Sequence, residues 1–373
     1  MRSERKDVAR SYIRYRYKKE VARKSKDDFF KAIGEKLAAV NVQNNNANVD
    51  EASFGGRIGE ASSVMTRQYA LDYLVSKMAR DNHLNNKIYI HDLDSYAVGS
   101  HNCLSIPFDK LLNKGFNTRQ ADIRPANSVN TAFQLVAVIF QLQSLQQFGG
   151  VSATHLDWTM VPFVRKSFYK HYTKGWKYFS DVKTPSGIVE ICSLGIDKVS
   201  IIDDLYTKTQ YSNFPQELQD KIYNYALEAT VDEINQAIEA MYHNLNTLQS
   251  RSGNQLPFTS INYGTCTLPE GRMIIKGLIE GSIKGVGKFH KTSIFPCGIF
   301  QIMKGINKEP GTPNYDLKRL ALESTALRLY PNYANVDWSG NAGYDVNDPR
   351  TYFSTMGCRT ANGWDINGLG QLK

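Results

Sequence analysis

The amino-acid sequence predicts an α/β protein whose strands run parallel. Segments 257–263 and 294–303 are rich in aromatic and β-branched residues and are predicted to be strands, the second one interrupted by Pro296 and Gly298. Between them, 271–283 has the apolar spacing of a helix. A strand, a helix and a second strand in this order are typical of parallel α/β architecture, which is therefore the expected fold class.

The composition is that of a globular protein. The chain has 373 residues, of which 42% are hydrophobic and 22% charged, enough for one large domain or two ordinary ones. No apolar run approaches the roughly 18 residues that a membrane helix needs, and the N-terminus begins with charged residues rather than an apolar leader. We therefore expect a cytoplasmic protein that makes no use of a membrane.

The N-terminal region is predicted to be helical and separate from the rest. Helical patterns cover 7–24 and about 26–39, and the asparagine-rich stretch 41–50 favours turns. We place a boundary there, which gives an N-terminal segment, 1–50, and a main domain, 51–373. The net charge is +9, and the densest basic block, 10–26, is interleaved with tyrosines. Such a block either binds phosphate groups or forms a solvated helix face.

The next segments combine helical, strand and acidic patterns. An amphipathic helix is predicted for 66–82 and a short strand for Ile88-Tyr-Ile90. His91, Asp92 and Asp94 follow directly, and they form either a metal-binding cluster or a hydrogen-bonded support pair. The support pair is the commoner arrangement, so we expect no metal here.

Two further helices are predicted on stronger signals. The first follows Asn127 and Ser128, which are candidate N-caps, and is stopped by Gly149-Gly150. The second covers about 215–250, with a narrow apolar seam that favours packing along another helix. Residues 151–215 between the two show no pattern that assigns a structure.

The five cysteines are scattered and include no C-x-x-C pair; they are Cys103, Cys192, Cys266, Cys297 and Cys358. This spacing argues against a disulfide framework and against a ribbon-type zinc site. Cys358 differs from the others because it follows Gly357 in a segment of small residues, 354–363, that is predicted to be a loop. It is either a reactive thiol at a loop tip or a small buried hydrophobe in a turn.

Several motifs along the chain resemble one enzyme family. Met356-Gly-Cys-Arg359 is similar to the finger-loop motif of the anaerobic (class III) ribonucleoside-triphosphate reductases, and Ile90-His-Asp-Leu-Asp94 followed by Asn102-Cys103 resembles their first active-site strand. Three more segments resemble the family in the same order, namely 257–259, 292–296, and 316–325 with 328–331. Because this ordered set is far more specific than any single motif, the chain is identified as a large catalytic subunit of this kind.

The resemblance implies a fold and two site residues. The fold is the ten-stranded α/β barrel of glycyl-radical enzymes with its finger loop, preceded by a segment similar to the end of an ATP-cone. Cys358 is expected to carry the thiyl radical that attacks the ribose of a ribonucleoside triphosphate, and Cys103 to face it. The product is the 2′-deoxyribonucleoside triphosphate, a precursor for DNA replication. Cys297 stands where relatives often carry lysine and is expected to be structural, while Cys192 and Cys266 match no motif.

The resemblance also implies cofactors and partners. These are a glycyl radical made by an S-adenosylmethionine/iron–sulfur activase, formate or a thiol redoxin as reductant, and ATP or deoxynucleotide effectors. A homodimer is expected, with the glutamine-rich helix after Ser128 near the dimer contact. Neither the Arg-Val-x-Gly-Tyr radical segment nor the family's four-cysteine zinc site occurs in the sequence. We therefore expect residues 51–373 to form a partial barrel that is inactive without a C-terminal companion fragment.

Two alternatives remain at the level of sequence. Another glycyl-radical enzyme, such as a formate-lyase, also uses a finger-loop cysteine, but it is not expected to carry the motifs around His91 and Cys103. A non-catalytic protein that binds nucleotides or nucleic acid through the basic N-terminal helix is the second alternative. Its binding should weaken steeply with salt, whereas the reductase is expected to make no direct contact with nucleic acid.

Overall fold

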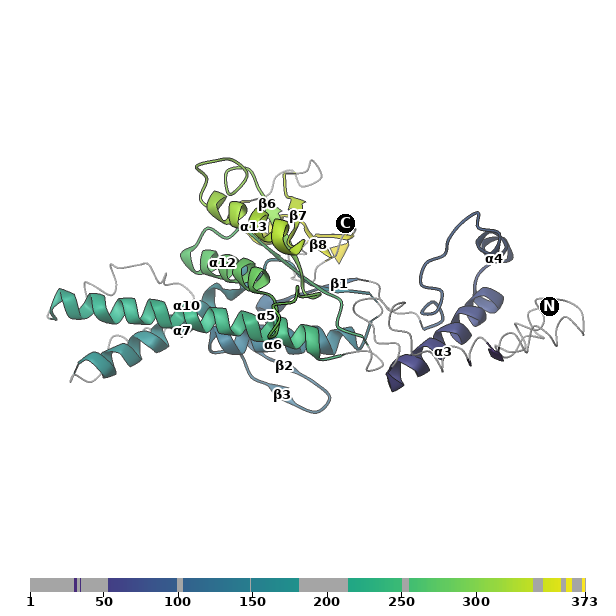
Figure 1. Ribbon diagram of the computed structural model, residues 1–373, viewed down its shortest axis with the longest axis horizontal. Helices are drawn as coiled ribbons and strands as arrows, with labels where there is room; N and C mark the ends of the chain where they lie inside the picture. Colours follow the sequence, from purple (N-terminus) through teal and green to yellow (C-terminus); the bar gives the residue numbers. More distant parts are fainter. Residues whose placement is uncertain are drawn as a thin grey trace, which may run out of the picture. The chain divides into compact units, whose positions relative to one another are not determined.

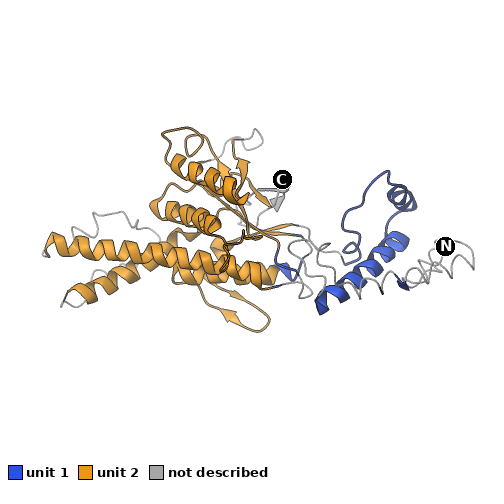
Figure 2. Ribbon diagram, viewed as in Figure 1, with its two compact units in different colours: residues 1–102, 144–149, 249–257 blue, residues 103–143, 150–248, 258–373 orange. Residues whose placement is uncertain are grey.

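The computed structural model divides the chain into two compact units (Figure 2). Unit 1 comprises 1–102, 144–149 and 249–257, and unit 2 comprises the remainder. The structure describes residues 30–31, 34, 53–98, 103–147, 149–180, 214–249, 255–337, 345–356, 360–363 and 371–372. Most of the two predicted N-terminal helices and the predicted boundary after residue 50 lie outside the described residues, so these remain predictions.

In the part of unit 1 described between residues 53 and 98, a π-helical turn joins two helices. α3 (Phe54–Tyr69) continues into the turn Ala70–Leu74, and α4 (Lys77–Leu84) follows. The single helix predicted for 66–82 is wrong because the chain turns extended at Val75, and the Ser76 Oγ then accepts a hydrogen bond from the Ala79 N–H to cap a new helix. Ile88–Ile90 form no strand; the Ile90 N–H instead donates to His83 Nδ1 at 3.1 Å.

Unit 2 is built on a five-stranded sheet in the order β1-β4-β5-β6-β7, with every neighbouring pair parallel (Figure 1). The strands are β1 (Leu104–Ile106), β4 (Val151–Ala153), β5 (Thr259–Tyr263), β6 (Cys297–Ile302) and β7 (Asn332–Asn335). The parallel α/β class and the two predicted strands, now β5 and β6, are confirmed.

Helices connect these strands. They are α5 (Phe108–Lys114), α6 (Val129–Ser144), α7 (Leu156–Phe179), α10 (Gln216–Thr247), α12 (Pro269–Lys284) and α13 (Tyr315–Arg328), and a small hairpin of β2 (Phe116–Asn117) and β3 (Asp122–Ile123) lies between α5 and α6. The predicted helices after Ser128, over 215–250 and over 271–283 are confirmed. Ser128 caps the first of them, its Oγ accepting from the Thr131 N–H at 3.2 Å.

The sequence analysis missed α7 because this helix is buried around much of its circumference. Its large aromatic residues include Phe168, Tyr172 and Trp176, all fully buried, and Pro162 lies inside it. A helix that is apolar on several sides has no narrow stripe of apolar residues. The periodic spacing of apolar residues that identified α10 is therefore missing in α7. α7 packs along α10 and against β5.

Helices cover one face of the sheet, called here the outer face. Side chains alternate along strands, and the outer face carries Tyr263, Phe300 and Tyr333. The Tyr333 hydroxyl hydrogen-bonds to Thr325 Oγ1 of α13 at 2.9 Å. Burial raises the pKa of Tyr263 well above its usual value, as expected for a phenol enclosed between sheet and helices.

Asp157, in the first turn of α7, fixes the loop that leaves β5. Its Oδ2 accepts hydrogen bonds from the backbone N–H groups of Gly264, Thr265 and Cys266 at 2.9, 3.1 and 3.0 Å. Gly264 has φ +125°, a conformation that favours glycine. Burial raises the pKa of Asp157, while its four backbone donors, the Trp158 N–H among them, act in the opposite direction.

Replacing Asp157 is expected to destabilise the chain strongly. Asp157→Ala leaves several buried N–H groups without an acceptor, and the free energy of unfolding should fall by about 3 kcal/mol or more. Denaturant unfolding of the variant and of Asp232→Ala, an exposed aspartate on α10, tests this. The control should change stability by less than about 0.5 kcal/mol. Equal effects of the two substitutions would show that the Asp157 contacts are energetically unimportant.

Candidate active site

The sheet face opposite the helices, called here the inner face, is largely polar. The strand register places on it the polar or thiol side chains Ser105, Ser152, Ser260, Asn262, Cys297, Gln301 and Asn332, together with the apolar Ile299 and Ala334. Ser152, Ser260, Asn262 and Gln301 are fully buried. Buried polar groups in central strands require partners. These partners come from a hairpin near the end of the described chain.

The hairpin strands β8 (Ser354–Met356) and β9 (Thr360–Gly363) pair antiparallel, and β10 (Gln371–Leu372) extends the pair to three strands. Asn262 holds β8 on the inner face, since its Nδ2 donates to the Thr355 carbonyl at 2.8 Å and its Oδ1 accepts from the Thr355 N–H at 3.0 Å. Ser152 Oγ donates to the same carbonyl at 3.1 Å, and Gln301 Nε2 donates to the Phe353 carbonyl at 3.2 Å. Three sheet strands therefore hold β8.

The connection from β8 to β9 contains Cys358. Residues 357–359 lie outside the described residues, so the predicted place of the Cys358 thiol stays a prediction. The segment 354–363 was expected to be a loop without regular structure, yet it forms two strands around a short connection. The sequence offered little sign of this, because each strand is only three or four residues long.

Cys103 lies at the start of β1. The Leu104 N–H donates to the Gly150 carbonyl at 3.1 Å, so pairing with the segment of β4 begins directly after Cys103. Cys103 stands two residues before Ser105, which is in register with Ser152 on the inner face. Cys103 itself directly precedes β1, and continuing the alternation of strand side chains back to it predicts a place on the side of the sheet that β8 covers. Its side chain is partly buried.

The other cysteines differ in their surroundings. Cys297 is in register with Ser260 on the inner face, and its Sγ lies 3.6 Å from the Tyr330 hydroxyl. Cys266 is buried, which raises the pKa of its thiol, and a Cβ at Gly271 would lie 2.2 Å from its Sγ. Among the described residues, Cys103, Cys266 and Cys297 form no disulfide. Cys192 lies outside the described residues.

A buried histidine that the sequence analysis did not single out lies where β4 ends. His155 is 5% exposed, and its Nδ1 is 2.7 Å from Thr154 Oγ1. Burial lowers the pKa of His155 to about 4, although the nearby Asp109 and Asp348 act to raise it. Asp348 is paired with Arg350 at 2.7 Å in the segment that leads into β8. His155 is therefore neutral at pH 7.

Stability should consequently depend on pH through His155. Between pH 6.5 and about 4 the unfolded chain binds a proton at this residue that the folded chain does not, so stability falls by up to about 3 kcal/mol as the pH drops through this range. His155→Gln should flatten this part of the profile of unfolding free energy against pH. Identical slopes in His155→Gln and the unaltered chain would contradict the assignment.

The acidic motif in unit 1 behaves as a set of support pairs. His91 Nδ1 lies 2.5 Å from Asp92 Oδ1, and Ser63 Oγ donates to Asp94 Oδ2 at 2.9 Å. Within the described parts of the chain, no group of three or more His, Cys, Asp or Glu side chains is arranged to hold a metal ion. The support-pair interpretation therefore fits better than the metal cluster.

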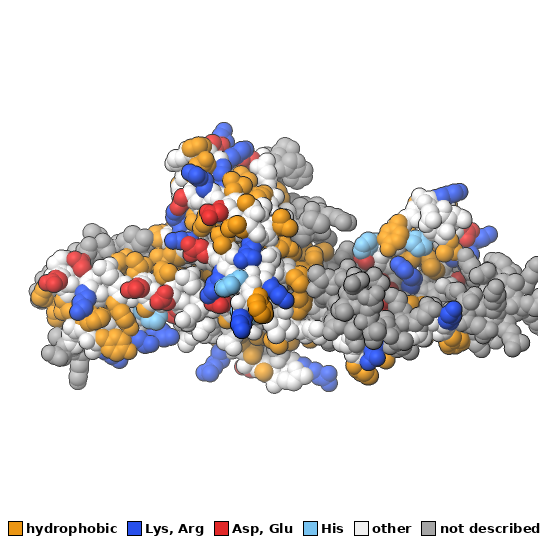
Figure 3. Space-filling view, viewed as in Figure 1, with side chains coloured by type: hydrophobic (Ala, Val, Ile, Leu, Met, Phe, Trp, Pro, Cys, Tyr) orange, Lys and Arg blue, Asp and Glu red, His pale blue; other side chains and the backbone are white. Residues whose placement is uncertain are grey.

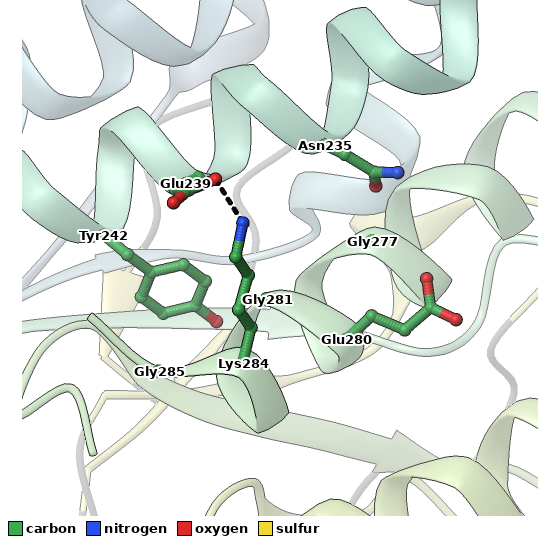
Figure 4. A pocket seen from close by; sticks show the side chains of 8 residues that line it. All are labelled: Asn235, Glu239, Tyr242, Gly277, Glu280, Gly281, Lys284 and Gly285. Carbon is green, nitrogen blue, oxygen red and sulfur yellow. Dashed lines mark hydrogen bonds and ion pairs between the residues drawn. The ribbon is translucent and has the colours of Figure 1, made fainter. Parts of the chain in front are cut away.

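A hollow of about 190 Å³ lies between α10 and α12 (Figure 4). Gly277 allows the two helices to approach closely, because a Cβ there would lie 2.8 Å from Ile238 Cδ1. Glu239 and Lys284 form an ion pair at its edge, 2.8 Å apart. These groups satisfy one another, and the hollow is a gap in helix packing rather than a second reaction site.

Charges are mixed on the surface. On the face drawn in Figure 3, lysine and arginine side chains of unit 2 alternate with aspartate and glutamate, and no extended patch has one sign. The basic block 10–26 lies outside the described residues. No helix among the described residues is long and apolar enough to cross a membrane.

The family model described as anaerobic ribonucleoside-triphosphate reductase matches residues 45–372. The chain belongs to this family. It is 28% identical over 364 residues to the anaerobic ribonucleoside-triphosphate reductase of Haemophilus influenzae, and 28% identical over 364 residues to that of Escherichia coli K12. Each alignment covers 96% of this chain and 45% of the relative. The corresponding enzyme of bacteriophage T4 is 28% identical over 318 residues, which are 85% of this chain.

The fold agrees with the family. The anaerobic ribonucleotide reductase of Thermotoga maritima, crystallised with dATP and CTP, superposes with a TM-score of 0.51 and 14% identity. The match covers 88% of this chain and 49% of that structure. The chain spans less than half the length of the curated relatives that it matches. Its five parallel strands correspond to part of the larger fold, while the ten-stranded barrel remains an expectation.

Proposed function

We propose that this chain is the part of an anaerobic ribonucleoside-triphosphate reductase that holds the two reacting thiols. The observation that carries the proposal is the attachment of β8 to the buried polar inner face by Ser152, Asn262 and Gln301. This attachment supports a place for the connection that contains Cys358 on the side of the sheet where Cys103 is expected. We infer that the two cysteines, far apart in the sequence, belong to one site.

In this site Cys358 takes the hydrogen atom from C3′ of the ribose. Sulfur suits this step because its S–H bond is weak enough to exchange hydrogen with carbon in both directions. The substrate radical at C3′ then loses the 2′-oxygen as water, for which Cys103 supplies a proton that it regains from the 3′-hydroxyl, and Cys103 next gives its hydrogen atom to C2′ and becomes a thiyl. The external reductant restores the Cys103 thiol with a hydrogen atom and returns the resulting 3′-ketone to a C3′ radical with one electron and one proton. Cys358 finally returns its hydrogen to C3′ and is a thiyl again.

The two electrons for the reduction come from outside the chain. With formate as reductant, one ribonucleoside triphosphate, one formate and one proton give one deoxyribonucleoside triphosphate, carbon dioxide and water. A thiol redoxin would supply the same two electrons and become a disulfide. The sequence and the fold agree equally well with both reductants.

The radical that oxidises Cys358 is proposed to reside on a glycine of a companion segment. When present, this glycyl radical supplies the hydrogen-atom acceptor for the Cys358 thiol, and a radical S-adenosylmethionine activase generates it. The topology of the described sheet allows further strands to be added, because β1 and β7 are its edge strands and each pairs with a neighbour on one side only. Open edges of a parallel sheet are where further barrel strands would add.

We further propose ATP or deoxynucleotide effectors, a homodimer and a cytoplasmic location for the complete enzyme. The effectors are supported by the Thermotoga maritima relative, which was crystallised with dATP and CTP. The homodimer and the ATP-cone-like character of residues 1–50 rest on resemblance to the family alone.

The proposal is tested by reconstitution under strict anaerobiosis. The chain is assayed with a ribonucleoside triphosphate, ATP, formate, activase and S-adenosylmethionine, first alone and then with a separately expressed companion that carries Arg-Val-x-Gly-Tyr. We expect deoxynucleotide only from the mixture. A glycyl-radical signal in electron paramagnetic resonance, or deoxynucleotide, from the chain alone would refute the division of roles. A soluble mixture that binds nucleotide but forms no product would refute the reductase function.

A further inference from the structure

We propose that Asn262 is a positioning residue for the hairpin of β8 and β9 and fixes the register of β8, the strand that leads to Cys358. The inference rests on the proposed function and adds to it a residue that acts through the backbone of β8. Asn262 contacts one residue of β8 through both ends of its amide: Nδ2 donates to the Thr355 carbonyl at 2.8 Å, and Oδ1 accepts from the Thr355 N–H at 3.0 Å.

This contact specifies the register of β8. In a strand, successive backbone N–H and C=O groups point to alternate sides, so a shift by one residue would turn both Thr355 groups away from the amide. The amide needs a donor and an acceptor of the same residue. A slipped β8 would therefore lose both hydrogen bonds and leave a fully buried side-chain amide without them.

Neighbouring side chains hold the Asn262 amide in the required orientation. Its Nδ2 also lies 3.1 Å from Ser152 Oγ and 3.0 Å from the Ala153 carbonyl, both on the adjacent strand β4. These acceptors identify the nitrogen end of the amide, which leaves the oxygen end for the Thr355 N–H. The orientation is thus fixed by β4 before β8 is added.

Met356 gives a second indication of a fixed register. A Cβ at Gly150 would lie 1.8 Å from Met356 Cε, so the side chain of Met356 occupies space that only glycine leaves open. Ser260 Oγ lies 3.2 Å from Met356 Sδ. A shifted β8 would carry Met356 out of this space. The apolar contact and the Asn262 amide therefore favour the same alignment.

The consequence for Cys358 follows from chain geometry. Cys358 is three residues beyond Thr355, and three residues reach at most about 10 Å. Fixing Thr355 thus limits how far from it the backbone of residue 358 can lie. Hydrogen transfer between sulfur and carbon needs positions held to within about 0.5 Å, and a site of this kind depends on the residues that support it.

The test compares substitutions that match in place and burial. Asn262→Leu keeps the volume and removes both hydrogen bonds, and Asn262→Asp keeps an acceptor for the Thr355 N–H but presents oxygen to the Thr355 carbonyl. The matched control is Thr259→Val, on the outer face of β5 and equally buried, whose Oγ1 has no hydrogen-bond partner in the described structure. Thermal unfolding establishes that all three variants are folded.

Two measurements on the chain need no enzymatic activity. The first is hydrogen–deuterium exchange of a peptide that covers β8. Exchange should accelerate by about 30-fold in Asn262→Leu, the effect of two lost hydrogen bonds, and change little in Thr259→Val. The second is the rate of alkylation of Cys358 by iodoacetamide, which should rise in both Asn262 variants. Unchanged exchange and unchanged alkylation would overturn the proposal.

A third measurement separates positioning from general stability. In the reconstituted enzyme, Asn262→Asp should lower kcat by about 100-fold with KM for the nucleotide nearly unchanged, as expected when the reacting thiol is displaced but substrate binding is intact. Faster exchange and alkylation with a normal kcat would overturn the positioning role. If the wild-type mixture forms no deoxynucleotide, the proposed reductase function fails, while exchange and alkylation still decide whether Asn262 holds β8.

Discussion

Cys358→Ala in the reconstituted enzyme is expected to abolish deoxynucleotide formation, with a loss of about 10⁴-fold or more in turnover. The thiol is the group that removes the C3′ hydrogen, and alanine has no atom that can carry the radical. The affinity for the nucleotide should be nearly unchanged, since the side chain acts in hydrogen abstraction and not in binding. Anaerobic product analysis and equilibrium binding measure the two quantities.

A second cysteine of the inner face provides the control. Cys297 is in register with Ser260 and contacts Tyr330, and no role in the reaction is assigned to it. Cys297→Ala should retain turnover within a few-fold. Deoxynucleotide from the Cys358→Ala enzyme would exclude this residue as the thiyl. Equal loss in both variants would show that the assay reports general damage to the inner face.

The α/β class was predictable because parts of the chain follow simple periodic patterns. β5, α12 and β6 follow one another with clear strand and helix spacing, and α10 has a single apolar seam. The family was predictable because its motifs keep their order over almost the whole chain. In both cases the signal lies in segments whose structure is decided by nearby residues or by a specific sequence.

The sequence analysis failed where tertiary contacts decide the structure. α7 is enclosed on several sides, so its sequence shows no narrow stripe of apolar residues. The helix predicted for 66–82 is divided, because Val75 is extended and Ser76 caps a new helix. Ile88–Ile90 have the composition of a strand but find no partner strand; Ile90 bonds to His83 instead. Strand propensity describes a side chain's fit to a sheet and cannot supply the neighbour.

The same distinction between sequence signals and tertiary contacts applies to the candidate site. Cys103 and Cys358 were proposed from motifs, and the register of β1 and the attachment of β8 are compatible with both. Asn262, Ser152 and Gln301 were not singled out, because a polar residue in a strand is ambiguous until the opposing backbone is known. Asn262 and Gln301 nevertheless lie in the two predicted strands, and a polar residue in a core strand is a signal, since such groups require partners.

Cys103→Ala should also abolish deoxynucleotide formation, by about 10³-fold or more, but at a later step than the Cys358 substitution. The thiyl on Cys358 can still remove the C3′ hydrogen, so exchange of tritium from 3′-labelled substrate or release of the free base should persist. Cys358→Ala should show neither. This contrast separates the hydrogen abstraction from the delivery of hydrogen to C2′.

Cys103→Ser refines the assignment. A serine hydroxyl can donate a proton to the departing oxygen, but its O–H bond is too strong to give a hydrogen atom to the substrate radical. The serine enzyme should therefore release more free base than the alanine enzyme and still form no deoxynucleotide. Turnover of either variant at the wild-type rate would show that Cys103 only packs at the start of β1. In that case the hydrogen for C2′ must come from a group outside the inner face as described, and the two-thiol site would be wrong.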